Sequence, residues 1–206
     1  PAARDALAAR CTCRSFRYHQ ETISREMETR GVFFVVSGSV RVVNWSYSGR
    51  EVSFDDIHAG GTFGALDAID GGARSASVIA REATTLGQVA PKIFMETVPN
   101  NPETARRLME PLAGISGRST ERIFELSVFG ANIRINADLL HKAEPNRRDD
   151  NSAAVSPIPI HPEIAAHVST TRETVARVLD DLARRDIVIR EKDRLIVPNV
   201  DALAEE

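Results

Sequence analysis

Short apolar runs separated by turn residues fill the chain from about residue 11 to residue 91. Within GVFFVVSGSVRVVNW, residues 31–45, two β-branched and aromatic runs are split by Ser37-Gly38-Ser39, which predicts a β-hairpin. A second turn is expected at Ser48-Gly49, followed by a strand around residues 50–54. Strands at this spacing predict a small antiparallel barrel or jelly roll.

Helical spacing of apolar residues begins near Asn101. Pro102 and Pro111 each precede good helix formers, so both are expected at helix starts. From about 111 to 142 the pattern predicts a long amphipathic helix. Its apolar stripe favours a seam with a partner helix in a dimer, and the alternative is packing on the β-domain. The stripe residues recur at steps of three and four: Leu112, Ile115, Leu126, Phe129 and Ile133.

The polar, aperiodic stretch EPNRRDDNSAAVSPIP, residues 144–159, predicts a connection between two domains. We therefore expect a first domain over residues 1–142, which includes the long helix, and a second over residues 143–206.

Two helical patterns, a short turn between them and a final hairpin make up the second domain. Pro162 opens the first helix, and Thr170 with Glu173 predicts a capping box for the second. Two apolar strands then flank the charged stretch REKDR. This order predicts a winged helix-turn-helix and, with the jelly roll, an α+β protein. The residues expected to be buried on the two helices are Ile164, Ala165, Val168, Val175, Val178, Leu179 and Leu182.

Composition argues against a protein that binds nucleic acid through bulk positive charge. The net charge is −3, and the segment from Pro157 onward carries 7 Arg and Lys against 10 Asp and Glu. Any contact with DNA must therefore come from a local arrangement of side chains.

The second helix of a helix-turn-helix enters the major groove by its N-terminal end. Here that end carries Thr170, Thr171, Arg172, Glu173 and Arg177. Arginine can donate two hydrogen bonds to guanine, glutamate can accept from cytosine, and threonine hydroxyls suit phosphates. The alternative is that Glu173 caps the helix and pairs with Arg177 on a solvated face. Together with the turn and the wing, these residues favour DNA binding.

The stretch TTRETVARVLDDL, residues 170–182, resembles the recognition helix of the Crp–Fnr, or catabolite activator, family of bacterial transcription regulators. Residues 49–80 resemble the phosphate-binding cassette of its cyclic-nucleotide-binding β-roll, and residues 118–140 resemble its long dimer helix. The resemblance implies a homodimer whose β-roll binds a small effector, and which binds a two-fold-related site on double-stranded DNA and contacts RNA polymerase. The usual turn glycine is Ser169 here, and the four cysteines of the iron–sulfur branch are absent.

The resemblance also implies an effector pocket, with cyclic AMP or another nucleotide as the candidate effector. Gly64, Arg74 and Ser75 match positions that hold the cyclic phosphate, and Ser119 and Thr120 match hydroxyls placed against the base. The acid that accepts the ribose hydroxyl is replaced by Ala65. Loss of such a hydrogen bond costs about 1.5–3 kcal/mol.

A competing interpretation is a regulator that needs no ligand and keeps only a vestigial pocket. Arg74 would then form an internal salt bridge with Asp67 or Asp70. Asp67 lies in a short helical turn and is expected to point elsewhere, so we do not count it as a replacement for the missing acid.

An enzyme is not expected. A cupin-like metal site needs clustered histidines, whereas only His19 and His58 lie in the β-region and no H-x-H pair exists. Cys11 and Cys13, even with His19, form an incomplete metal shell. No apolar run spans the ~20 residues that a membrane helix needs, so no membrane partner is expected. Two cysteines in 206 residues suit a reducing, cytoplasmic setting.

Overall fold

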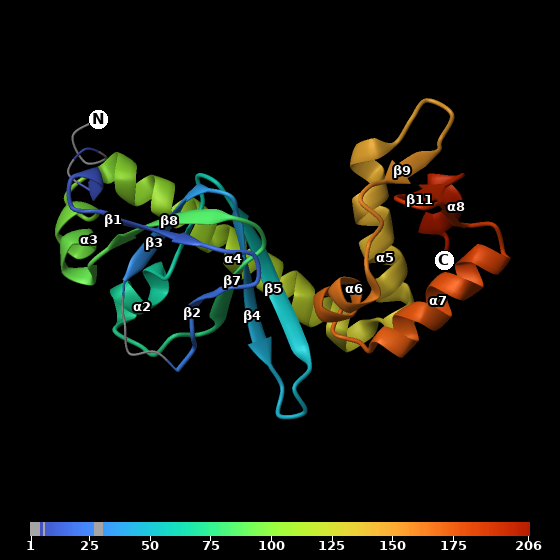
Figure 1. Ribbon diagram of the computed structural model, residues 1–206, viewed down its shortest axis with the longest axis horizontal. Coiled ribbons are helices and arrows are strands. Elements are labelled where there is room, and N and C mark those ends of the chain that lie inside the picture. Colours follow the sequence, from blue (N-terminus) through green and yellow to red (C-terminus); the bar gives the residue numbers. More distant parts are fainter. Residues whose placement is uncertain (1–4, 6, 27–30) are drawn as a thin grey trace. The chain divides into compact units, whose positions relative to one another are not determined.

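The computed structural model describes residue 5, residues 7–26 and residues 31–206, and its elements are labelled in Figure 1. Contacts divide the chain into two compact units, Pro1–Arg118 and Ser119–Glu206. The boundary between the two units lies inside a helix. The functional boundary expected between residues 142 and 143 stays a prediction.

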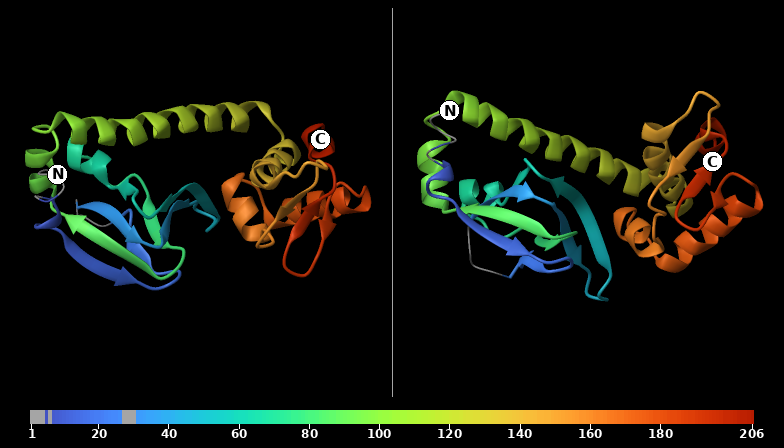
Figure 2. Two further views of the ribbon diagram at one scale, coloured as in Figure 1. Left: turned by 90° about the horizontal axis from the view of Figure 1, so that it is seen from above. Right: turned by 45° about the horizontal axis from the view of Figure 1, so that its top comes forward.

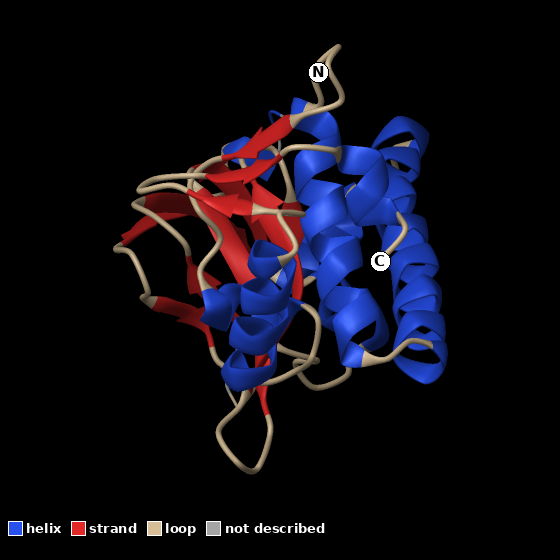
Figure 3. Ribbon diagram, turned by 90° about the vertical axis from the view of Figure 1, so that its right-hand side faces the viewer, coloured by secondary structure: helices blue, strands red, loops and turns tan. Residues whose placement is uncertain are grey.

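Two antiparallel sheets form the β-roll of the first unit. Their cores meet in one apolar cluster that includes Phe33, Val40 and Leu86, and Figure 3 draws these strands in red. The antiparallel β-roll expected from the sequence is therefore confirmed. One sheet has the order β1 (Thr12–Phe16), β8 (Thr84–Val89), β3 (Val32–Ser37), β6 (Thr62–Phe63); the other has the order β2 (Glu21–Ile23), β7 (Ser77–Ala80), β4 (Ser39–Trp45), β5 (Glu51–His58).

The hairpin expected around Ser37-Gly38-Ser39 is wrong. β3 pairs with β8 and β6, whereas β4 pairs with β5 and β7, so the chain changes sheets at this turn. Gly38 has φ 79°, and a Cβ there would lie 2.6 Å from the carbonyl oxygen of Ala83. Turn residues report a reversal of direction but not whether the two strands pair. The turn at Ser48-Gly49 does join a true hairpin, β4–β5.

Two short helices, α2 (Ala65–Asp70) and α3 (Pro91–Thr97), pack at one end of the β-roll. A second apolar cluster joins them to the strands and contains Val32, Ala65, Val89 and Phe94. Ala65 is only 4% exposed. The position at which the family resemblance implies an acid is thus part of the hydrophobic core here.

The long helix expected over 111–142 is two helices. The first, α4 (Pro102–Val128), appears as one uninterrupted helix in Figure 2. Pro102 starts α4 as expected, but Pro111 lies inside it, so that expected start is wrong. After α4 the chain breaks at Gly130, whose extended backbone (φ −64°, ψ 161°) precedes α5 (Ala131–Ala143).

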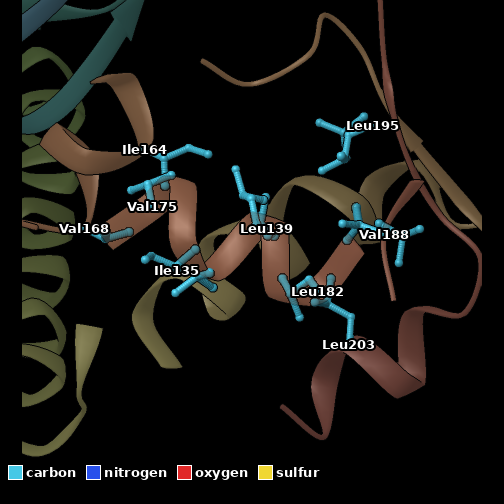
Figure 4. Packing of buried hydrophobic residues seen from close by; sticks show 14 of the residues in the cluster. Ile135, Leu139, Ile164, Val168, Val175, Leu182, Val188, Leu195 and Leu203 are labelled. Carbon is cyan, nitrogen blue, oxygen red and sulfur yellow. The ribbon is translucent and has the colours of Figure 1, made fainter. Parts of the chain in front are cut away.

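The second unit is the winged helix-turn-helix expected from the sequence. Its core joins α5, both helices of the motif, the sheet and the last helix, as Figure 4 shows. All seven residues that the helical pattern assigns to the core are buried. The elements after α5 are a 3₁₀ turn (Glu144–Asn146), β9 (Ala153–Val155), α6 (His161–His167), α7 (Arg172–Arg184), β10 (Ile189–Arg190), β11 (Leu195–Val197) and α8 (Val200–Ala204).

A buried carboxylate ties α5 to the first helix of the motif. Asp138 lies 2.5 Å from His167 Nδ1 and 2.5 Å from Lys142 Nζ, and its side chain is 3% exposed. Burial alone would raise the pKa of Asp138, but the hydrogen bond with His167 and the charge of Lys142 lower the pKa below its ordinary value.

We predict that Asp138→Asn lowers the free energy of unfolding of this unit by about 1–3 kcal/mol at pH 7. Because folding lowers the pKa of Asp138, its stabilisation is complete above pH about 4 and disappears as pH falls through the folded value. The difference in free energy of unfolding between wild type and Asp138→Asn should therefore disappear below pH about 4. Urea unfolding followed by circular dichroism, with amide exchange in α5 to α7, measures it. The exposed Asp149→Asn is the control, and an equal loss in both variants would contradict the assignment.

Candidate DNA-binding helix and effector pocket

The N-terminus of α7 carries the residues expected to contact DNA. Thr171 is its N-cap, and the Thr171 hydroxyl accepts a hydrogen bond from the Thr174 amide at 3.2 Å. The expected capping box of Thr170 with Glu173 is therefore wrong by one residue. Thr170 is buried, and its amide donates to the carbonyl of Ala165 at 2.9 Å.

Glu173 sits in the first turn of α7 and is exposed. Hydrogen bonds from its own backbone amide and from the Thr171 hydroxyl lower its pKa. These hydrogen bonds stabilise the charged carboxylate of Glu173, which can accept a further hydrogen bond from a base edge.

Arg172 and Arg177 are both exposed on α7. Within the part of the chain that the structure describes, neither forms an ion pair. The other arginines near this surface are committed to carboxylates. Arg184 pairs with Asp181 at 2.9 Å, and Arg190 pairs with Asp180 at 3.4 Å. The two guanidinium groups available to a new acceptor are therefore those at the N-terminal end.

The turn between α6 and α7 contains Ser169 in the left-handed region, with φ 53°. Glycine adopts this backbone conformation freely, whereas the conformation costs other residues about 1–2 kcal/mol. The altered turn expected from Ser169 in place of glycine is thus a real strain, which neighbouring contacts must offset.

Two arginines supply those contacts, and neither was assigned this role from the sequence. Arg122, near the end of α4, donates to the carbonyl of His167 and to the Ser169 hydroxyl at 3.2 Å. Arg134, on α5, donates to the carbonyl of Val168 at 3.1 Å. Burial lowers the pKa of Arg122 from its ordinary value. Together they satisfy the carbonyls at the C-terminal end of α6, where positive charge is favourable.

In the β-roll, Gly64 and Arg74 come together, as the family resemblance implies. Gly64 has φ 76°, and a Cβ on it would lie 2.6 Å from Arg74 Nη1. Arg74 is 5% exposed, and its Nη2 donates to the carbonyl of Gly31 at 2.8 Å. Its guanidinium carbon lies 5.7 Å from the centre of the Phe33 ring.

Asp67 pairs with Arg74 through a short contact between Oδ2 and Nη1, and it is also 5% exposed. Asp67 thus points toward Arg74, and its exclusion as a replacement for the missing acid stays a prediction. The internal salt bridge considered as an alternative is present, and it involves Asp67. Asp70 is exposed and instead accepts from the Gly72 amide at 2.7 Å.

The remaining expected pocket residues are exposed. Ser75 follows Arg74, and its carbonyl accepts a hydrogen bond from Asn44 at 3.1 Å. Ser119 and Thr120 lie on α4, in the second compact unit. Their assignment to the effector stays a prediction.

Cys11 and Cys13 flank the start of β1, the edge strand of its sheet. Burial raises the pKa of the Cys11 thiol, and the neighbouring Cys13 raises it further. Among the described residues no group of three or more His, Cys, Asp or Glu side chains could hold a metal ion. In the same part of the chain, no helix is long and apolar enough to cross a membrane.

Comparison with known proteins matches two domain models to separate parts of the chain. Residues 13–101 match the model of the cyclic nucleotide-binding domain, and residues 137–206 match the Crp-like helix-turn-helix domain. The chain is 25% identical over 167 residues to the cAMP-activated global transcriptional regulator CRP of Salmonella typhimurium, covering 81% of this chain and 80% of that protein. It is 29% identical over 161 residues to the cyclic AMP receptor protein of Thermus thermophilus, covering 77% and 71%.

Solved structures of this fold cover nearly the whole chain. The c-di-GMP-responsive global regulator CLP of Xanthomonas campestris matches with a TM-score of 0.84 at 15% identity, over 95% of this chain and 98% of that one. A CooA mutant from Carboxydothermus hydrogenoformans matches with a TM-score of 0.80 at 22% identity, over 96% and 88%. With both domain models matched in order and relatives aligned across the two, the chain belongs to the Crp–Fnr family of transcription regulators.

Proposed function

We propose that this chain is a dimeric transcription regulator that binds double-stranded DNA through α7, under the control of an effector domain formed by the β-roll. The observation that carries the proposal is the pair of exposed guanidinium groups, Arg172 and Arg177, on the first two turns of the second helix of the motif. Their geometry suits bidentate hydrogen bonds to guanine, and Glu173 suits cytosine. Thr170 and Thr171 complete the expected set. The buried Thr170 serves the turn, whereas the exposed Thr171 can contact a phosphate.

The net negative charge does not oppose this proposal. The two aspartates of α7 are paired: Asp180 with Arg190, and Asp181 with Arg184 and Arg185. They neutralise the far end of the helix, so the N-terminal end keeps an excess of positive charge together with the amides of its first turn.

A dimer is supported by the exposed apolar surface of α4. The helix buries none of its residues, and Ile115 and Leu126 are exposed by 40% and 42%. Phe129, just beyond the helix, and Ile133 on α5 are also exposed, but the break at Gly130 separates them from the stripe of α4. A second copy of the chain would cover these side chains and give the two recognition helices the two-fold symmetry that palindromic sites require.

Three features of the pocket bear on the identity of the effector. The buried Arg74 and Gly64 fit a phosphate cassette, but the ribose acid is replaced by the buried Ala65 and the arginine already has a carboxylate. Cyclic AMP is therefore a poor fit to the side chains present. Contact with RNA polymerase, a cytoplasmic location and the lack of enzymatic activity are proposed from the family.

We predict that Arg172→Ala and Arg177→Ala abolish sequence-specific binding, because each removes a base contact of about 1–3 kcal/mol in every half-site. Binding-site selection with the wild-type protein first supplies the operator. Fluorescence anisotropy at one fixed salt concentration then compares that operator with a scrambled duplex.

Arg184→Ala is the matched control for this prediction. It removes a guanidinium from the same helix at the end that leaves the groove, so specificity should persist. All three variants should remain dimers in sedimentation experiments. Specific binding retained by both N-terminal variants would overturn the assignment of α7 as the recognition helix.

We also predict that Leu126→Glu dissociates the dimer, because it places two carboxylates in an apolar seam. The dimer dissociation constant should rise on the order of a hundredfold, about 3 kcal/mol. Val128→Glu is the control, since two residues along a helix turn the side chain by about 200°. Sedimentation equilibrium measures both variants. Dissociation by Val128→Glu alone would assign the seam to the opposite face.

A further inference from the structure

The buried ion pair of the β-roll places an anion where a phosphate would otherwise be needed. Arg74 and Asp67 are each 5% exposed and contact one another directly. A buried guanidinium is costly unless it is paired and hydrogen-bonded. Here both requirements are met by the chain itself, through the Asp67 carboxylate and the carbonyl of Gly31.

The surroundings hold Arg74 in this arrangement. Nη1 contacts Asp67, Nη2 contacts the Gly31 carbonyl at 2.8 Å, and the Phe33 ring lies beside the guanidinium. Gly64 approaches so closely that a Cβ would lie 2.6 Å from Nη1 and 2.8 Å from the same carbonyl. The guanidinium therefore has little freedom to turn toward a different acceptor while Asp67 is charged.

A carboxylate and a phosphodiester are both oxyanions, and each offers acceptors to the same guanidinium fork. They cannot share Nη1, because two buried negative charges at this spacing repel each other. A nucleotide would have to displace Asp67 and leave its carboxylate buried without a partner. It would also lack the ribose contact, since Ala65 packs in the core with Val32 and Phe94.

We propose that Asp67 is the resident anion of the phosphate subsite, so that a cyclic phosphodiester binds the β-roll only when Asp67 is neutralised. The inference rests on the proposed role of the β-roll as effector domain. Asp67 then excludes phosphate-bearing effectors from this subsite. The wild-type protein would respond to ligands that place no phosphate there.

Asp67→Asn in the full-length chain tests the proposal, with Asp70→Asn as the matched control from the same helix. Thermal unfolding and calorimetry are measured with cyclic AMP, cyclic GMP, inorganic phosphate and uncharged adenosine. We expect Asp67→Asn to lower the melting temperature of the β-roll by about 10 °C, because it removes the carboxylate that contacts the buried guanidinium of Arg74. A cyclic nucleotide should restore most of this loss, adenosine should not, and phosphate separates a general anion site from a nucleotide site.

Wild type and Asp70→Asn should show no shift with any of the four compounds, and the Asp67→Asn affinity for a cyclic nucleotide should exceed theirs at least tenfold. Equal binding by wild type and Asp67→Asn would overturn the proposal. So would an Asp67→Asn protein that no anion stabilises, or that stays unfolded with every anion present. The double variant Asp67→Asn/Arg74→Met should fold and bind none of them, and anion binding by it would also overturn the proposal. DNA binding by α7 is measured separately, so failure of the proposed function and failure of this inference give different results.

Discussion

Burial of one face of α7 is the constraint on which the DNA-binding surface depends. Val175, Val178, Leu179 and Leu182 are nearly inaccessible and pack against α5, α6 and the strands. Because a helix repeats every 3.6 residues, this stripe leaves Glu173 and Arg177 on the opposite side, while Arg172 lies in the first turn. The packing that stabilises the unit also directs these polar residues outward. It fixes the orientation of α7, because rotating the helix would expose about four large side chains, each of which contributes about 1.5–3 kcal/mol when buried.

The end of α6, which leads into that helix, is held by hydrogen bonds from two arginines. Arg122 of α4 and Arg134 of α5 both donate to the end of α6, and Arg122 also contacts the strained Ser169. These contacts explain why a non-glycine residue is tolerated in the turn.

The sequence predicted the parts of the fold that depend on local periodicity. The buried residues of α6 and α7, the wing and the β4–β5 turn follow from patterns a few residues long. Contacts over long distances were not predictable in this way. The Ser37–Ser39 turn reverses the chain whether or not β3 pairs with β4, and only the sheets decide between them. Pro111 lies inside α4 although its ring removes a backbone donor, so a proline does not by itself mark a helix start. The cap of α7 shifted by one residue because two adjacent threonines offer equivalent hydroxyls.

Asp67 illustrates why a site is harder to predict than a fold. Short helical turns direct side chains that are two residues apart to different sides, so an acid two positions beyond Ala65 is no substitute for one at that position. That argument considers only neighbours along α2, whereas Arg74 returns to α2 from the following loop and contacts Asp67 there. A motif specifies residue types in order, whereas a buried charge requires a partner in space. Where a family motif keeps its arginine but another acid lies within reach, that acid can neutralise the arginine. The presence of the motif then no longer implies the same ligand.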